Sequence, residues 1–183
     1  MAPRIYTKRG DDGTTGLLYG GRVRKDSLQI ELNGVVDEAQ AALGLARAES
    51  APGSELDQRV STLARQLYVL MAEVATAPEH RDRLAAGTTL VTQDMVDALE
   101  EGIDDLLSRV DMPSDFVIPG ANRVSAALDV ARTIVRRAER LAVVEPVAGS
   151  LVVAYLNRLS DLLWAMARWQ EGPEHPLSKG TAH

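Results

Sequence analysis

The sequence predicts an all-α protein: a five-helix up-and-down bundle preceded by a glycine-rich N-terminal arm. Five segments place apolar residues at the three-and-four spacing of a helix face, and strand-like alternation is scarcely visible anywhere. Proline or glycine separates most of these segments from the next. Because amphipathic helices with short connections pack into bundles, we expect a single domain over residues 1–183.

The arm is expected over residues 1–25. Five glycines and several threonines in this stretch favour loops and turns over helix. The bundle is expected over residues 26–171, and a flexible tail over 172–183. The helices are expected from 26 to the break at Pro52, from a cap at Ser54 to Pro78, from a cap at Thr92 to Val110, over 121–143 and over 150–170. Residues 78–91 are expected to form a surface connection.

The charge balance and the residue inventory exclude several classes of protein. Lys and Arg total 20 against 26 acidic residues, and the net charge of -6 argues against a nucleic-acid or membrane surface. There is no Cys, which excludes disulfides, thiolate metal sites and Cys nucleophiles. The first ten residues contain no apolar segment typical of a signal peptide, and no run of 18 apolar residues occurs. We therefore expect a cytoplasmic protein.

Histidine and carboxylate chemistry is also poorly represented. His80, His175 and His183 lack the companions of a catalytic triad. No Glu-x-x-His pair occurs, so a di-iron carboxylate bundle is excluded.

Two helices carry polar faces that allow two interpretations each. On the fourth helix, Asp129, Arg132, Arg136 and Glu139 follow one another at spacings of three, four and three, so they share one face. That face is either a solvated surface with helical ion pairs or a wall that binds an anion. On the fifth helix, Asn157 begins a similar polar stripe, and it could contact a nucleotide or bond another helix.

The arm itself could bind phosphate. Glycine-rich backbone can approach phosphates closely, and Lys8 and Lys25 add positive charge. A flexible basic tail is the alternative. Neither the P-loop fingerprint nor Gly-x-Gly-x-x-Gly is present, so the two commonest nucleotide motifs are absent.

Five segments together point to a family. IYTKRGDDGTTGL, GGRVRKDS, NGVVDEAQAALG, FVIPGANRVSAALDVARTIVRRAER and YLNRLSDLLWAMAR occur in this order. In order and spacing they resemble the PduO-type ATP:cob(I)alamin adenosyltransferases, and the resemblance covers nearly the whole chain. It implies a homotrimer with active sites at the subunit interfaces, where the arm of one subunit closes over ATP against a neighbour.

The resemblance assigns an ATP-binding set and a corrinoid side. The ATP-binding positions are Thr7, Lys8, Arg9, Gly10, Thr15, Gly16, Lys25, Arg136, Arg137, Glu139, Arg140 and Asn157. Lys8, Lys25 and Arg136 are expected to act with Mg²⁺, whose ligands are not assigned, on the leaving triphosphate. On the corrinoid side, Asp37 and Arg132 are expected to pair between subunits, and Phe116 to lie near the lower face of the corrin.

Some positions depart from the family pattern. Asp129 stands where relatives commonly carry His, and Ala121 where a second Gly is usual. In the arm, Arg9 and Asp12 replace a usual Thr and Lys. The first two departures concern the corrinoid side more than ATP binding.

The function implied is transfer of the 5′-deoxyadenosyl group of ATP to the cobalt of cob(I)alamin, with release of triphosphate. Since cobalt(I) is itself the nucleophile, no nucleophilic side chain is required. A separate reductase is expected to supply reduced cobalamin. The alternatives are a non-catalytic corrinoid or nucleotide carrier with the same fold, and a purely structural helical trimer.

Overall fold

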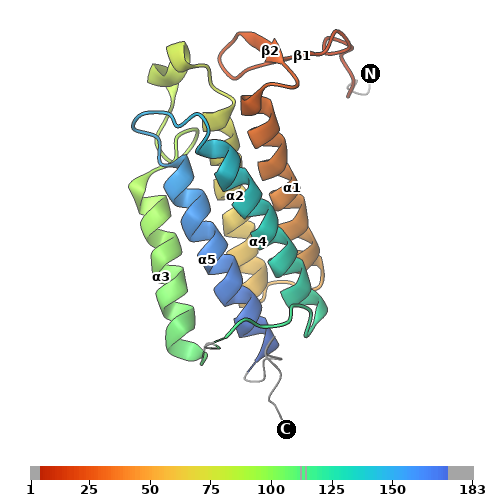
Figure 1. Cartoon of the computed structure of the whole chain (residues 1–183), viewed down its shortest axis with the longest axis vertical. Coiled ribbons are helices and arrows are strands. Elements are labelled where there is room, and N and C mark those ends of the chain that lie inside the picture. The colour runs from red at the N-terminus through yellow and green to blue at the C-terminus, as the bar shows by residue number, and fades with distance from the viewer. Residues whose placement is uncertain (1–4, 112, 114, 173–183) are drawn as a thin grey trace.

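The computed structural model describes residues 5–111, 113 and 115–172, and five long helices dominate it (Figure 1). The helices are α1 (Leu28–Ala48), α2 (Glu55–Val74), α3 (Gln93–Arg109), α4 (Arg123–Ala142) and α5 (Val152–Glu171). Each lies in a segment where apolar periodicity predicts a helix, so this part of the prediction is confirmed. The predicted tail, with His175 and His183, lies outside the described residues except for residue 172.

The helix axes alternate in direction along the chain, as an up-and-down bundle requires (Figure 1). α4 packs against both α1 and α5, α2 packs against α1, and α3 packs against α5 at one edge. One end of the bundle carries the arm, the α2–α3 connection and the α4–α5 loop (Figure 1). The opposite end carries the α1–α2 loop and the α3–α4 loop, which contains Phe116. The arm and the loop that contains Phe116 thus lie at opposite ends of the bundle.

Side-chain caps fix where the helices begin. Ser54 accepts a hydrogen bond from the backbone N–H of Asp57 at 3.2 Å, and Thr92 accepts one from Met95 at 3.4 Å. Both caps are confirmed predictions. Asn122 forms a capping box with Ser125, so α4 begins at Arg123 rather than at 121.

The arm differs from its prediction, because it contains a short antiparallel hairpin. Strand β1 (Thr14–Gly16) pairs with β2 (Arg22–Arg24), with Thr15 opposite Val23. The strands are only three residues long, too short to show alternation in the sequence. The turn between them uses positive φ at Tyr19 (65°), Gly20 (112°) and Gly21 (88°), and glycine adopts such angles without strain.

A buried acid fastens the loops at the arm end of the bundle. Glu73, near the end of α2, is 1% exposed. Its carboxylate accepts hydrogen bonds from Arg81 Nη2 at 2.7 Å, Ser150 Oγ at 2.6 Å and the backbone N–H of Val91 at 2.8 Å. Arg81 belongs to η1 (Pro78–Arg83), a short 3-10 helix inside the predicted surface connection. Glu73 therefore holds both the α2–α3 connection and the α4–α5 loop by hydrogen bonds.

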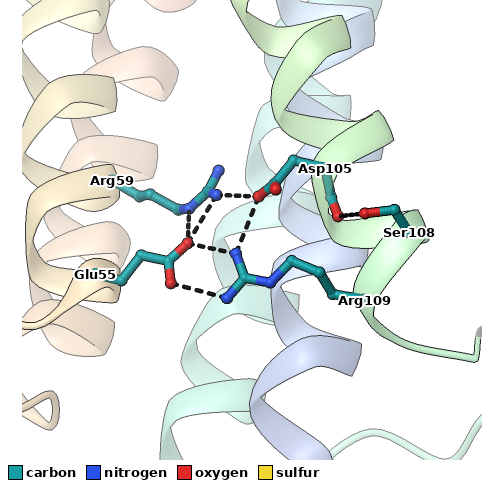
Figure 2. A network of polar contacts seen from close by, with 5 residues as sticks. All are labelled: Glu55, Arg59, Asp105, Ser108 and Arg109. Carbon is teal, nitrogen blue, oxygen red and sulfur yellow. Dashed lines mark hydrogen bonds and ion pairs between the residues drawn. The ribbon is translucent and has the colours of Figure 1, made fainter.

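At the other end, an ion-pair network attaches α3 to α2 (Figure 2). The Glu55 carboxylate accepts hydrogen bonds from Arg109 at 2.7 and 2.9 Å and from Arg59 at 2.8 and 3.0 Å. Asp105 accepts from both arginines as well. The two guanidinium groups lie over Trp169 of α5, at 6.0 and 5.3 Å from the ring centroid. The network thus joins three helices.

Within the described residues, no helix is both long and apolar enough to cross a membrane.

Candidate functional site

The first half of the candidate site is the loop that leads into the hairpin. Arg22 of β2 donates from Nη2 to the Arg9 carbonyl oxygen at 2.6 Å and to Thr14 Oγ1 at 2.6 Å. Asp12 accepts from the Thr14 N–H at 2.9 Å and from its hydroxyl at 2.8 Å. These hydrogen bonds from Thr14, assisted by nearby Arg22, lower the pKa of Asp12. The loop over residues 9–14 is therefore held in one conformation.

Gly10 and Lys25 approach each other closely in this loop. A Cβ atom on Gly10 would lie 3.1 Å from Lys25 Nζ and 3.1 Å from the Thr14 carbonyl oxygen. The absence of a side chain at Gly10 thus leaves room for the Lys25 ammonium group. Lys8 is exposed, with a positive φ of 60°, and Thr7, Arg9 and Lys25 are exposed too. Two lysines, one before β1 and one directly after β2, are therefore exposed on the arm.

The hairpin turn rests on the α2–α3 connection. The Leu18 N–H donates to the Ala75 carbonyl oxygen at 2.8 Å. Arg83 places its guanidinium carbon 4.5 Å from the Tyr19 ring centroid and donates to the Tyr19 carbonyl oxygen at 3.1 Å. Arg22 and Arg83 shape the arm, yet sequence reasoning assigned neither a role, because their partners are backbone oxygens that no spacing reveals.

The second half of the candidate site is the surface of α4. Arg136 and Arg140 are exposed one turn apart, and Arg140 Nη1 donates to the Arg136 carbonyl oxygen at 3.1 Å. The Arg136 guanidinium makes no hydrogen bond or ion pair with any residue in the described part of the chain. Its neighbour Arg137 differs, since it forms an ion pair with Glu38 of α1. Arg136 is thus a cation available to an external anion.

Asn157 of α5 lies beside this surface with both ends of its amide held. Its Nδ2 donates to Glu139 Oε1 at 2.9 Å, and its Oδ1 accepts from Arg158 Nη1 at 2.7 Å. Arg158 in turn donates to Glu100 of α3 at 2.7 Å. The inter-helix hydrogen bond considered as one alternative is therefore present, and together these two bonds fix the orientation of the amide.

The residues expected on the corrinoid side come from three places: α1, α4 and the loop before α4. Arg132 lies one turn from Arg136, about 6 Å along the axis, toward the end that carries Phe116. Phe116 is 86% exposed. Asp37 is exposed on α1, and in the described structure it makes no ion pair, whereas Arg132 pairs with Asp129 of its own chain.

The charged face of α4 is therefore neither a fully solvated surface with ion pairs nor a continuous wall of free cations, the two interpretations that the sequence allowed. Asp129 is buried, Arg132 is half-buried and Arg136 is exposed. Arg168 of α5, the basic partner of Asp129, is only 1% exposed. Along α4, this face therefore passes from the protein core at Asp129 to the surface at Arg136.

No hydrogen bond or ion pair between described residues joins the arm to Arg136, Arg140 or Asn157. A cavity of about 500 Å³ lies at the arm end, between α1, α2, α4 and α5. None of the predicted site residues lines it, so the candidate site is an open surface.

The described residues contain no group of three His, Asp or Glu side chains that could hold a metal ion. A Mg²⁺ ion that keeps several waters and binds chiefly through phosphate oxygens needs no such group.

Residues 5–170 match the sequence model of the cobalamin adenosyltransferase family. This chain belongs to that family. It is 40% identical over 171 residues to a corrinoid adenosyltransferase of Citrobacter freundii, covering 92% of this chain and 95% of that protein. A corrinoid adenosyltransferase of Bacillus subtilis (strain 168) is 38% identical, covering 90% and 85% of the two chains.

Solved structures agree with this membership. A variant of a PduO-type ATP:corrinoid adenosyltransferase from Lactobacillus reuteri, complexed with cobalamin and ATP, superposes with a TM-score of 0.85. Its sequence is 29% identical, and the match covers 97% of both chains. The helical fold is shared with that protein.

Proposed function

We propose that this protein transfers the 5′-deoxyadenosyl group of ATP to the cobalt of cob(I)alamin, forming adenosylcobalamin and releasing triphosphate. Family membership over residues 5–170 supports the reaction class. The observation that carries the proposal in this chain is the surface of α4, where Arg136, unpaired among the described residues, lies beside the anchored amide of Asn157. A cation and an oriented amide on one rigid element can bind a nucleoside triphosphate.

The reaction is a displacement at carbon. The electron pair of cobalt(I) forms a bond to the ribose C5′ atom, while the bond from C5′ to the triphosphate oxygen breaks and its electron pair leaves with triphosphate. The protein supplies no nucleophile. Placing the two substrates in line can contribute about 7–11 kcal/mol, and cations near the leaving group stabilise its growing charge.

Three cations are proposed to stabilise the negative charge of the leaving triphosphate. Lys8 and Lys25 are exposed on the arm and Arg136 is exposed on α4, so all three can reach an external phosphate. The remaining proposed ATP-binding residues surround them: Thr7, Arg9, Gly10, Thr15 and Gly16 in the arm, with Arg137, Glu139, Arg140 and Asn157 on the helices. Mg²⁺ bound to the triphosphate would neutralise part of its charge.

The site is completed by a second copy of the chain, in a homotrimer. Its support is that no hydrogen bond or ion pair among the described residues joins the arm to Arg136, Arg140 or Asn157 of the same chain. In the trimer, Asp37 of one copy is proposed to pair with Arg132 of the next. Arg132 Nε already donates to Asp129, and its two terminal nitrogens have no partner among the described residues, so one of them can bond to Asp37.

Phe116 is proposed to form an apolar wall against the lower face of the corrin. A phenylalanine that is 86% exposed leaves a large apolar surface in water, which favours a ligand or a partner chain over it. Such a wall excludes water and the axial base, which eases reduction of cobalt(II). A separate cytoplasmic reductase is the proposed electron source.

Anaerobic optical spectroscopy tests the proposed function. Chemically reduced cobalamin, ATP and Mg²⁺ are mixed with the protein, and the cobalt(I) spectrum should give way to that of an alkylcobalt. The carrier alternative predicts a different result: both substrates bind at equilibrium, and the cobalt(I) spectrum persists. A structural trimer would bind neither.

A further inference from the structure

Asp129 is a buried carboxylate that joins two arginines. It lies on α4 and is 5% exposed. Its Oδ2 accepts a hydrogen bond from Arg168 Nη2 at 2.6 Å, and its Oδ1 accepts one from Arg132 Nε at 3.0 Å. One carboxylate thus links an arginine inside the bundle to another at its surface.

Arg168 holds the inner end of this link. Its side chain is 1% exposed, and it also donates to Glu171 Oε1 at 2.8 Å. Its guanidinium carbon lies 5.9 Å from the ring centroid of Trp164. Because a buried ion that loses its partner incurs a large desolvation cost, Arg168 keeps the Asp129 carboxylate in one orientation.

Arg132 is the outer end, and only one of its nitrogens is used. Nε bonds to Asp129, while the terminal nitrogens make no hydrogen bond to any residue of the described ranges. The guanidinium group is planar and its N–H directions are fixed relative to one another. Holding Nε therefore also sets the directions in which the terminal N–H groups point.

We propose that Asp129 is a positioning residue for the corrinoid substrate: backed by Arg168, it orients Arg132 toward an oxygen acceptor on the corrinoid side. The inference rests on the proposed function. An arginine whose plane is fixed beforehand loses less side-chain freedom when it binds. Arg132 lies toward the Phe116 end relative to Arg136, so the effect should concern the corrinoid and spare ATP.

Asp129→Asn is the main test, because it keeps the shape of the side chain and removes its charge. We expect the KM for cob(I)alamin to rise about tenfold, the scale for residues coupled by direct contact, with the KM for ATP changed less than about twofold. The same substitution in an Arg132→Ala background should raise the cob(I)alamin KM no further, since the oriented group is already absent.

Two further variants keep the test decisive. Arg168→Lys retains the buried charge but loses the planar donor, and it should raise the cob(I)alamin KM in the same direction by a smaller factor. It serves as the test if Asp129→Asn does not fold, as judged by a thermal melt. Tyr155→Phe is the matched control, because it removes a buried α5 hydrogen bond to Gln66, 2.8 Å long, that has no contact with Arg132. It should lower the melting temperature and leave both KM values unchanged.

Equal rises in the two KM values would overturn the proposal, as would additive effects of Asp129→Asn and Arg132→Ala. Failure of the proposed function would be visible separately: the parent chain would then show no conversion of cob(I)alamin, and the positioning role would fall with it. If the parent chain converts cob(I)alamin but the variants raise the KM values for cob(I)alamin and ATP equally, only the positioning role would be overturned.

Discussion

Arg136 and Arg137 are adjacent in the sequence and carry the same side chain, yet their surroundings differ. Arg137 reaches Glu38 on α1, whereas Arg136 extends to solvent without a partner in the described chain. The charge of Arg137 is therefore partly neutralised in the fold. That of Arg136 is available to the triphosphate, which makes it the better candidate for stabilising the leaving group.

The same substitution at both positions should give different results. Arg136→Lys keeps a positive charge but loses the planar fork that can hold two phosphate oxygens. We expect turnover to fall about tenfold or more, with helix content and melting temperature unchanged. Arg137→Lys should affect turnover less. Steady-state kinetics with ATP and circular dichroism on the same preparations decide the matter, and equal turnover for Arg136→Lys and the parent would remove Arg136 from the catalytic set.

Gly10 allows a second prediction at this scale. A Cβ there would lie 3.1 Å from Lys25 Nζ, tighter than most real contacts. Gly10→Ala should displace the ammonium group and raise the KM for ATP, with little change in stability because the loop is exposed. The control is Gly44→Ala on α1, where nothing lies within 4 Å of the new Cβ. An unchanged KM for Gly10→Ala would show that Lys25 does not need this position.

Among the elements, α3 depends most on charged groups for its attachment to α2. The network of Glu55, Arg59, Asp105 and Arg109 is drawn in Figure 2. Hydrogen bonds from Arg109, then from Arg59, lower the pKa of Glu55 from 4.5 to about 2. Since the folded-state pKa is the lower one, Glu55 contributes stability above pH 4.5, and this contribution is lost as the pH falls toward 2.

The free energy of unfolding should therefore decrease between pH 4.5 and 2 by an amount that Glu55→Gln abolishes. The side chain is 40% exposed, so screening by solvent limits the difference to about 1 kcal/mol. Urea titrations at several pH values measure it. Glu101→Gln serves as the control, because this exposed α3 residue takes part in no such network. Parallel pH profiles for Glu55→Gln and the parent would contradict the assignment.

The helices could be predicted from the sequence because each signal is local. The caps at Ser54 and Thr92 and the apolar stripes of α1 to α5 involve residues three or four positions apart. The hairpin could not, since its strands span three residues and the turn depends on contacts with the α2–α3 connection. Only distant contacts determine that Glu73 and Arg168 are buried, and a charged residue is ordinarily expected at the surface.

The candidate site was predictable to a similar extent. Composition indicates that the arm and α4 carry cations, but only family resemblance connected them to ATP and to a corrinoid. The structure adds the partners of Arg132 and Asn157, which distinguish held side chains from available ones. Glu139, which holds Asn157, and Arg168, which holds Asp129 behind Arg132, each lie on a different helix from the residue they hold, so no spacing within the sequence identifies them.

At the scale of the whole molecule, the arm and the α4 surface are the two parts that must come together. If each site takes its arm from one subunit and its α4 surface from another, defects in the two parts should complement each other. Lys25→Ala and Arg136→Ala chains, each of low activity alone, are unfolded together and reassembled as a mixture. Random association then gives intact sites at about one quarter of the interfaces.

Recovered activity in the mixture would support sites shared between chains. Activity no greater than that of the separate variants, with analytical ultracentrifugation showing mixed oligomers, would place the whole site within one chain. A monomeric parent would contradict the proposed trimer directly.

The leaving group provides the most direct test of the proposed reaction, because displacement at C5′ releases all three phosphates as one molecule. Under anaerobic conditions, cob(I)alamin and ATP are allowed to react with the protein, and samples are quenched at intervals. Adenosylcobalamin is measured by its absorbance and the phosphates by ion-exchange chromatography. We predict one triphosphate for each cobalt–carbon bond formed; pyrophosphate or ADP as the initial product, or bound substrates that give no product, would contradict adenosyl transfer by this protein.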